Sequence, residues 1–170
     1  MKGFLLLLLL SLSATAQAAP TVYKATADLT TLKTHGYEPH LHTQSQEPVS
    51  QWQDLASLDI DNVSPNDVWH VLTETPIRYH TAPRLSHAIR VLVCQETCAV
   101  AVSQVIEHID AGVVYHYAAR AGYWVVPEGF IGTVRVTMQV RLLSIPKDGE
   151  QGHKVFMYPP ETQSLTVGVY

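Results

Sequence analysis

Residues 130–142 alternate between apolar and polar side chains, and this period of two constrains the fold more than any other feature of the chain. The apolar positions are Phe130, Val134, Val136, Met138, Val140 and Leu142. The polar positions between them are Arg135, Thr137, Gln139 and Arg141. Because successive side chains of a β-strand point to opposite faces, the segment predicts a strand with one face in a core and the other in water.

Several other short segments share this strand character. Each is rich in β-branched or aromatic residues, and they are residues 87–94, 98–109, 113–120, 123–126, 154–158 and 164–170. Turn sequences such as Asp110-Ala111-Gly112 and Ala121-Gly122 separate some of them. About six to seven short strands with turns between them predict a mainly β protein, built as an antiparallel β-sandwich or a curled sheet.

Two segments that precede these strands have a helical pattern, which makes an α+β fold the alternative. Ser64 can cap a helix that begins at Pro65, and an apolar stripe follows. The stripe consists of Val68, Trp69, Val71 and Leu72. The pattern predicts a helix over residues 65–74, and the spacing of Trp52 and Leu55 predicts a shorter one within residues 50–58.

The N-terminal residues have the features of a secretory signal peptide. Lys2 precedes the apolar run 4–10, and Ala16-Gln17-Ala18 supplies small residues for cleavage after Ala18. We therefore expect a signal peptide over residues 1–18 and a periplasmic or secreted mature chain without a transmembrane segment. Within the mature chain, residues 19–49 predict an extended polar arm and residues 50–170 a single β-rich domain.

The charge of the chain bears on its partners. The sequence has 11 Lys and Arg against 15 Asp and Glu, a formal charge of -4. Proteins that bind nucleic acid by neutralising phosphates need an excess of basic residues, so we expect no nucleic-acid partner. Residues 19–75 hold two basic and eight acidic residues, whereas residues 76–145 hold six arginines and four acidic residues. The predicted sheet is therefore the basic part of the chain.

The candidate binding face combines arginines with aromatic residues of neighbouring predicted strands. Its members are Arg135, Arg141, Tyr115, Tyr117 and Trp124. Guanidinium groups pair with carboxylates in a bidentate manner, and exposed aromatic rings contact sugars or proteins. We therefore expect an envelope protein or an anionic glycan as partner. The alternatives are that the arginines decorate a solvated strand face and that the aromatic residues belong to the core.

Cys94 and Cys98 flank Gln95-Glu96-Thr97, which has the length of a three-residue hairpin loop. In an oxidising compartment this spacing predicts a disulfide across the hairpin. The Cys-x3-Cys spacing, taken with a distant histidine, also resembles the copper-relay proteins with a thioredoxin-like fold. That resemblance implies an alternative metal site, with Cys94, Cys98 and an imidazole from His40 or His42 as ligands.

The sequence contains no Gly-x-Ser-x-Gly motif, and we assign no catalytic residue and no cofactor. Asp59 and Asp61 would lie on one side of an extended chain, which leaves a small hydrolase as an alternative. The sequence predicts an exported, non-enzymatic binding or assembly component of the bacterial cell envelope. A periplasmic metal-handling protein is the other alternative.

Overall fold

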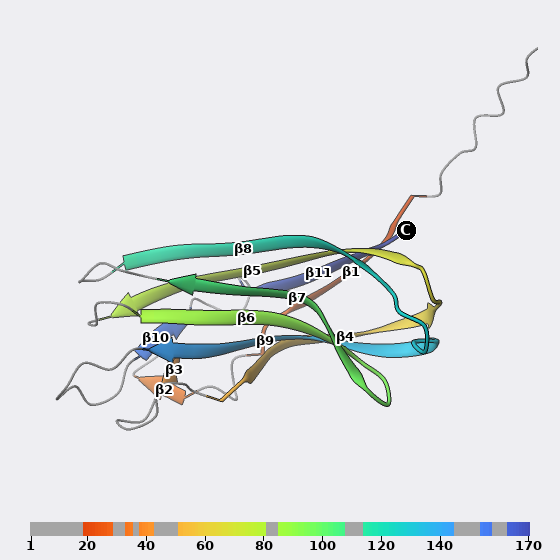
Figure 1. Cartoon of the computed structure of the whole chain (residues 1–170). Helices are drawn as coiled ribbons and strands as arrows, with labels where there is room; N and C mark the ends of the chain where they lie inside the picture. The colour runs from red at the N-terminus through yellow and green to blue at the C-terminus, as the bar shows by residue number, and fades with distance from the viewer. Residues whose placement is uncertain are drawn as a thin grey trace, which may run out of the picture.

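The computed structural model describes residues 19–28, 33–35, 38–42, 51–80, 85–107, 114–144, 154–157 and 163–170. These residues form strands and the turns between them, and the strands make two antiparallel sheets packed on one another (Figure 1). The predicted mainly β sandwich is confirmed. Within these residues no helix is long and apolar enough to cross a membrane.

Sheet A contains seven of the strands and sheet B four. Sheet A consists of β1 (Thr21–Thr26), β2 (Lys33–His35), β3 (Glu38–His42), β5 (Val68–His80), β8 (Val114–Val125), β10 (Lys154–Met157) and β11 (Ser164–Val169). Its order is β1-β11-β5-β10-β3-β2, and β8 pairs with the other edge of β5. Sheet B consists of β4 (Gln53–Val63), β6 (Leu85–Cys94), β7 (Cys98–Glu107) and β9 (Gly132–Ser144), in the order β4-β9-β6-β7.

The strand pairs are nested along the sequence. β1 pairs with β11, β4 with β9, β5 with β8, and β6 with β7. The chain therefore folds back on itself about the β6–β7 hairpin, and successive pairs alternate between the two sheets. Eight antiparallel strands paired in this way across two sheets form a jelly roll.

The core lies between the two sheets, and β9 shows why. Its apolar side chains, including Val136, Met138 and Leu142, are fully buried, whereas Arg135 is exposed on the opposite face. The buried side chains of β9 belong to the same cluster as Trp69 of sheet A and the other inward residues of that sheet. The alternation of this strand is confirmed, and each sheet keeps one outer face that is not part of the core.

The two predicted helices are strands, which corrects the sequence interpretation. Residues 65–74 begin in a turn, where Ser64 N donates to Asp67 Oδ2 at 2.8 Å and Asp67 N donates to Ser64 O at 3.2 Å. Asn66 has a φ of 70°, which a right-handed helix does not allow. The sequence that resembles a helix cap therefore makes the turn between β4 and β5. The segment 50–58 likewise enters β4 at Gln53.

The apolar stripe that suggested a helix arises from a strand with apolar side chains on both faces. Trp69 and Val71 point into the core and are fully buried, whereas Val68 is exposed and Leu72 half-buried on the outer face. Because apolar side chains occupy both faces of β5 here, the period of two is hidden and the spacing mimics that of a helix. The outer face of sheet A is therefore apolar at this point.

Pro76 lies inside β5 instead of stopping a helix. On one edge of β5, β11 pairs as far as Glu74 and β10 pairs from Ile77, so Pro76 faces the gap between these two strands. Its carbonyl oxygen, on that edge, accepts a hydrogen bond of 2.7 Å from Gln163 Nε2. A proline has no N–H to donate, and at the gap no ladder bond requires one.

The turn predicted at Ala121-Gly122 is absent, because both residues lie within β8. Gly122 is opposite Val71 of β5, and a Cβ built on it would lie 3.4 Å from Val102 Cγ2 of β7. The glycine thus allows close approach between β8 and β7, which are the edge strands of the two sheets.

Part of the predicted N-terminal arm belongs to sheet A. β1 pairs with β11 along its whole length, and β2 and β3 form a further antiparallel pair that reaches β10. Residues 29–32, 36–37 and 43–50 lie outside the described residues, as does the predicted signal peptide over residues 1–18.

Candidate binding surfaces

The arginines of the predicted binding face both lie on the outer face of sheet B. Arg135 is exposed on β9, directly opposite Asp59 of β4 and Cys94 of β6. Arg141 lies farther along β9, opposite Ala88 of β6. These two arginines therefore share a face, as the alternation of the strand predicted.

Trp124, an aromatic residue of that predicted face, does not join the arginines. The Trp124 ring packs against the core, with its centroid 5.2 Å from that of Trp69 and 6.0 Å from that of Phe130. Tyr115 and Tyr117 belong to β8 of sheet A, and their side chains lie outside the described part of the structure. Sheet B carries the arginines and sheet A carries these aromatic residues, so the structure does not assemble the predicted set into one patch.

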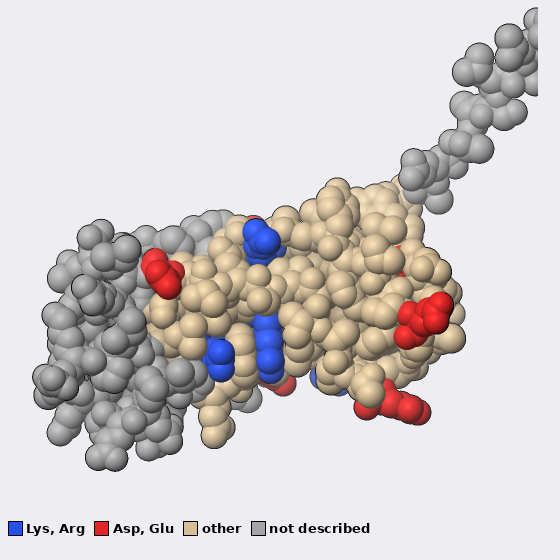
Figure 2. Space-filling model, viewed as in Figure 1, with Lys and Arg blue, Asp and Glu red and all other residues tan. Residues whose placement is uncertain are grey.

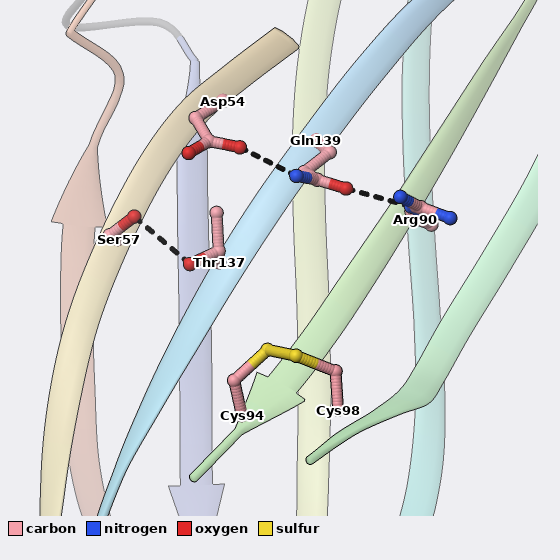
Figure 3. The surroundings of a disulfide bond; sticks show 7 residues. All are labelled: Asp54, Ser57, Arg90, Cys94, Cys98, Thr137 and Gln139. Carbon is pink, nitrogen blue, oxygen red and sulfur yellow. Dashed lines mark hydrogen bonds between the residues drawn. A yellow bond between two sulfur atoms is a disulfide. The ribbon is translucent and has the colours of Figure 1, made fainter. Parts of the chain in front are cut away.

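The predicted disulfide is present at the turn of the β6–β7 hairpin (Figure 3). Cys94 and Cys98 face each other in the register with a Cα separation of 4.1 Å, and the sulfur atoms are bonded at 2.10 Å. In the loop between them, Gln95 N donates to Thr97 O at 2.9 Å. Both sulfur atoms are bonded to each other, so neither is a thiolate available to a metal.

The candidate metal and hydrolase residues are dispersed. His40 and His42 lie on β3 of sheet A, at the end of the sandwich opposite the β6–β7 loop (Figure 1). Among the described residues, no group of three His, Cys, Asp or Glu side chains comes together. On β4, Asp61 Oδ1 accepts a hydrogen bond of 2.7 Å from Thr133 Oγ1, and Asp59 lies opposite Arg135.

Two arginines of sheet B converge on one tryptophan, and we name Arg90, Trp52 and Arg141 the arginine cluster. The Cζ atom of Arg90 lies 4.2 Å from the centroid of the Trp52 ring, and that of Arg141 lies 4.6 Å from it. Each guanidinium is attracted to the π electrons of the indole. Register makes this convergence possible, because Arg90 is opposite Gln139 and Arg141 follows two residues later on the same face.

A chain of hydrogen bonds connects the arginine cluster to β4 (Figure 3). Arg90 Nε donates to Gln139 Oε1 at 2.7 Å, and Gln139 Nε2 donates to Asp54 Oδ1 at 2.6 Å. The neutral amide therefore stands between the guanidinium and the carboxylate. One row farther along the sheet, the Ser57 and Thr137 hydroxyls are 3.1 Å apart.

The outer face of sheet A carries a different kind of surface, which we name the apolar face. Its exposed side chains are Val22, Val68, Tyr123, Val125 and Tyr170. Tyr123 lies on the edge strand β8 and is 73% exposed, which is a large fraction for an aromatic side chain. Figure 2 shows the molecule from the same side as Figure 1, and on this side charged side chains are few and uncharged surface predominates.

The strand register arranges part of the apolar face as a row across four strands. Val22 of β1 is opposite Gly168 of β11, Gly168 is opposite His70 of β5, and His70 is opposite Tyr123 of β8. The His70 and Tyr123 ring centroids are 5.0 Å apart. A Cβ built on Gly168 would lie 3.6 Å from Tyr170 Cε2, so the Tyr170 ring covers the glycine.

The sequence interpretation named Arg141 but neither surface as a whole, although the apolar face left a signal. Val68 and Leu72 are apolar at positions that alternate with the core residues Trp69 and Val71, which is the signature of an apolar outer face. The arginine cluster left none, because Trp52 precedes its strand and meets the arginines only through the pairing of three strands.

No protein-family model matches the chain, and no curated protein matches its sequence. Solved structures resemble its fold. The structure of the infectious bursal disease virus Gt strain aligns with a TM-score of 0.52 and 14% identity, over 88% of this chain and 32% of the viral chain. The chain thus spans about a third of the length of that viral protein. This likeness supports the β-sandwich fold alone.

Two further structures align with lower scores. The Eiger TNF of S. frugiperda aligns with a TM-score of 0.48 and 6% identity, over 90% of this chain and 94% of that one. A CBM4 structure aligns with a TM-score of 0.34 and 8% identity, over 87% of this chain and 95% of that one.

Proposed function

We propose that the protein is an exported, non-enzymatic binding or assembly component of the bacterial cell envelope, and that it contacts an envelope protein through the apolar face. The observation that carries this proposal is the gathering of Val22, Val68, Tyr123, Val125 and Tyr170 on the outer face of one sheet. Contiguous exposed apolar surface on a soluble domain marks a site of protein interaction or a ligand site.

The shape of the apolar face supports a protein partner. The row from Val22 to Tyr123 crosses four neighbouring strands, a width of about 14 Å. Valine side chains on both sides of the aromatic rings supply apolar area without hydrogen-bonding groups. Interfaces between proteins have such an apolar centre and are enriched in tyrosine.

Export rests on two observations of different kinds. The N-terminal residues have the pattern of a cleaved signal peptide, with a small-residue site ending at Ala18. The Cys94–Cys98 disulfide is typical of proteins that fold in an oxidising compartment. The intact mass of the exported protein tests this part, and we expect a chain that begins at Ala19. A chain that retains residues 1–18 would contradict it.

The partner is tested by photo-crosslinking in intact cells. A photoreactive amino acid at position 123 should give one discrete protein adduct, which mass spectrometry can identify. The control position is 105, because Val105 is 57% exposed, comparable to Val125 at 54%, but lies on sheet B. The replacements Val68→Ser and Val125→Ser should abolish the adduct at position 123. Equal adducts at positions 123 and 105, or none at position 123, would refute the proposal.

A further inference from the structure

We propose that the arginine cluster is a binding site for the carboxylate or sulfate groups of an anionic glycan. The site lies on the outer face of sheet B and shares no side chain with the apolar face. Each proposal can therefore fail without the other.

The geometry of the cluster brings two positive charges together on one surface. Arg90 and Arg141 are diagonal neighbours on adjacent strands, a relationship that separates their Cα atoms by about 7 to 8 Å. Both guanidinium groups contact the Trp52 ring, which holds them near each other. Two like charges at this separation repel, and an oxyanion between them would remove the repulsion.

Within the described part of the chain, one side-chain hydrogen bond involves these two guanidinium groups, that of Arg90 Nε. Arg90 Nε donates to the neutral amide of Gln139, and that amide in turn donates to the carboxylate of Asp54. Arg141 Nε is buried and has no hydrogen-bond partner among the residues that the structure describes. A guanidinium has five N–H donors in a planar fork that fits carboxylate, phosphate and sulfate oxygens. The cluster therefore contains at least one guanidinium donor, Arg141 Nε, that no described residue accepts from.

The surroundings of the cluster favour a glycan over an acidic peptide. Peptides that bind a sheet commonly add a strand at a free edge, but β9 and β6 are both internal strands of sheet B. The neighbouring row instead carries the half-buried Ser57 hydroxyl, which is paired with the hydroxyl of Thr137 at 3.1 Å. An anionic glycan has hydroxyl groups beside each acidic group. Its acidic group would contact the arginine cluster, and a neighbouring hydroxyl would contact the row of Ser57.

The experiment measures binding by the mature full chain with isothermal titration calorimetry. The ligands are oligogalacturonate for the carboxylate, dextran sulfate for the sulfate, neutral dextran, and polyglutamate as the peptide alternative. We expect the chain to bind at least one of the anionic glycans and not neutral dextran. We also expect affinity to fall as salt concentration rises.

The variants separate the cluster from the general charge of the protein. The double variant with Arg90→Gln and Arg141→Gln should bind the anionic glycan about tenfold more weakly or worse, because charge-assisted hydrogen bonds are lost. Arg120→Gln makes the same change of charge per residue at an exposed site on β8 of sheet A, and should leave the affinity unchanged. The charge-preserving pair Arg90→Lys and Arg141→Lys should also weaken binding, because lysine lacks the planar fork.

Several outcomes would overturn the proposal. Failure of both anionic glycans to bind would remove the site altogether. An equal loss with Arg120→Gln would show that net charge attracts the ligand and that the cluster is not a site. Polyglutamate bound as tightly as oligogalacturonate, with the same dependence on Arg90 and Arg141, would refute the assignment to a glycan. The affinities are compared between variants whose melting temperatures match closely. If the glutamine double variant is unstable, the lysine double variant replaces it in the comparison.

Discussion

Trp69 and Trp124 lie directly opposite each other on β5 and β8, with their ring centroids 5.2 Å apart and their planes tilted by 57°. The next pair in the same register, His70 and Tyr123, points to the opposite side of sheet A. One step along the strand pair therefore separates the core from the apolar face.

This relationship predicts that two truncations, one on each side of sheet A, change the stability by very different amounts. Trp69→Ala removes a fully buried side chain and should lower the free energy of unfolding by about 3 to 5 kcal/mol. Tyr123→Ala removes a ring that is largely exposed, and should change it by less than about 0.5 kcal/mol. Chemical denaturation measures both. A large loss of stability with Tyr123→Ala would show that the apolar face is part of the folded core and not a surface for a partner.

The same strand pair explains how far the sequence could predict the fold. The alternation in β9 was readable because one of its faces is apolar and the other polar. In β5 the outer side chains Val68 and Leu72 are also apolar, and the pattern imitated a helix. The alternation of apolar and polar residues disappears where the outer face of a strand is also apolar. Buried and exposed positions then carry the same types of residue, and the strand cannot be recognised from its period.

The contribution of the disulfide to stability can be measured. Cys94 and Cys98 close a short loop, so replacing both with serine should lower the free energy of unfolding by about 2 kcal/mol. The hairpin register should persist, because the β6–β7 pairing extends from Cys94 to Ser86. Thiol titration of the native protein should find no free thiol. Two reactive thiols in protein from an oxidising compartment would reopen the metal alternative.

The contact of Gly122 with Val102 predicts a coupled pair of substitutions. Gly122→Val places bulk against Val102 Cγ2 and should destabilise the protein by about 1 to 3 kcal/mol. In the Val102→Ala background the same substitution should cost less, because the methyl groups that it meets are gone. A double-mutant cycle measures the coupling energy. Additive effects would mean that β8 and β7 are not in close contact at this point.

The arginine cluster could not be predicted from the sequence, because its residues come together only through the pairing of three strands. Arg141 was identified as a polar residue of an alternating strand, and this is as far as one strand can lead. Arg90 and Trp52 are far from it in the chain, and they meet it only because β6 and β4 pair with opposite edges of β9. A site made across three strands requires the pairing to be known.

The Gln139 amide, which lies between Arg90 and Asp54, should control whether Arg90 is available to a ligand. Gln139→Glu would place a carboxylate at the position where the amide oxygen now accepts from Arg90 Nε, 2.7 Å away. The new carboxylate would neutralise Arg90 and could not donate to Asp54 Oδ1, as the amide nitrogen now does at 2.6 Å. We expect the affinity for oligogalacturonate to fall by about tenfold, through loss of one charge-assisted contact.

The matched control is Ala119→Glu, which adds the same charge at an exposed position of sheet A. It should alter the affinity only slightly, because charges separated by more than a Debye length, about 8 Å at physiological ionic strength, are largely screened. If Gln139→Glu binds the glycan as well as the unmodified protein, Arg90 does not contact the ligand. If both variants weaken binding equally, the effect is one of overall charge, and the amide of Gln139 has no part in keeping the guanidinium available.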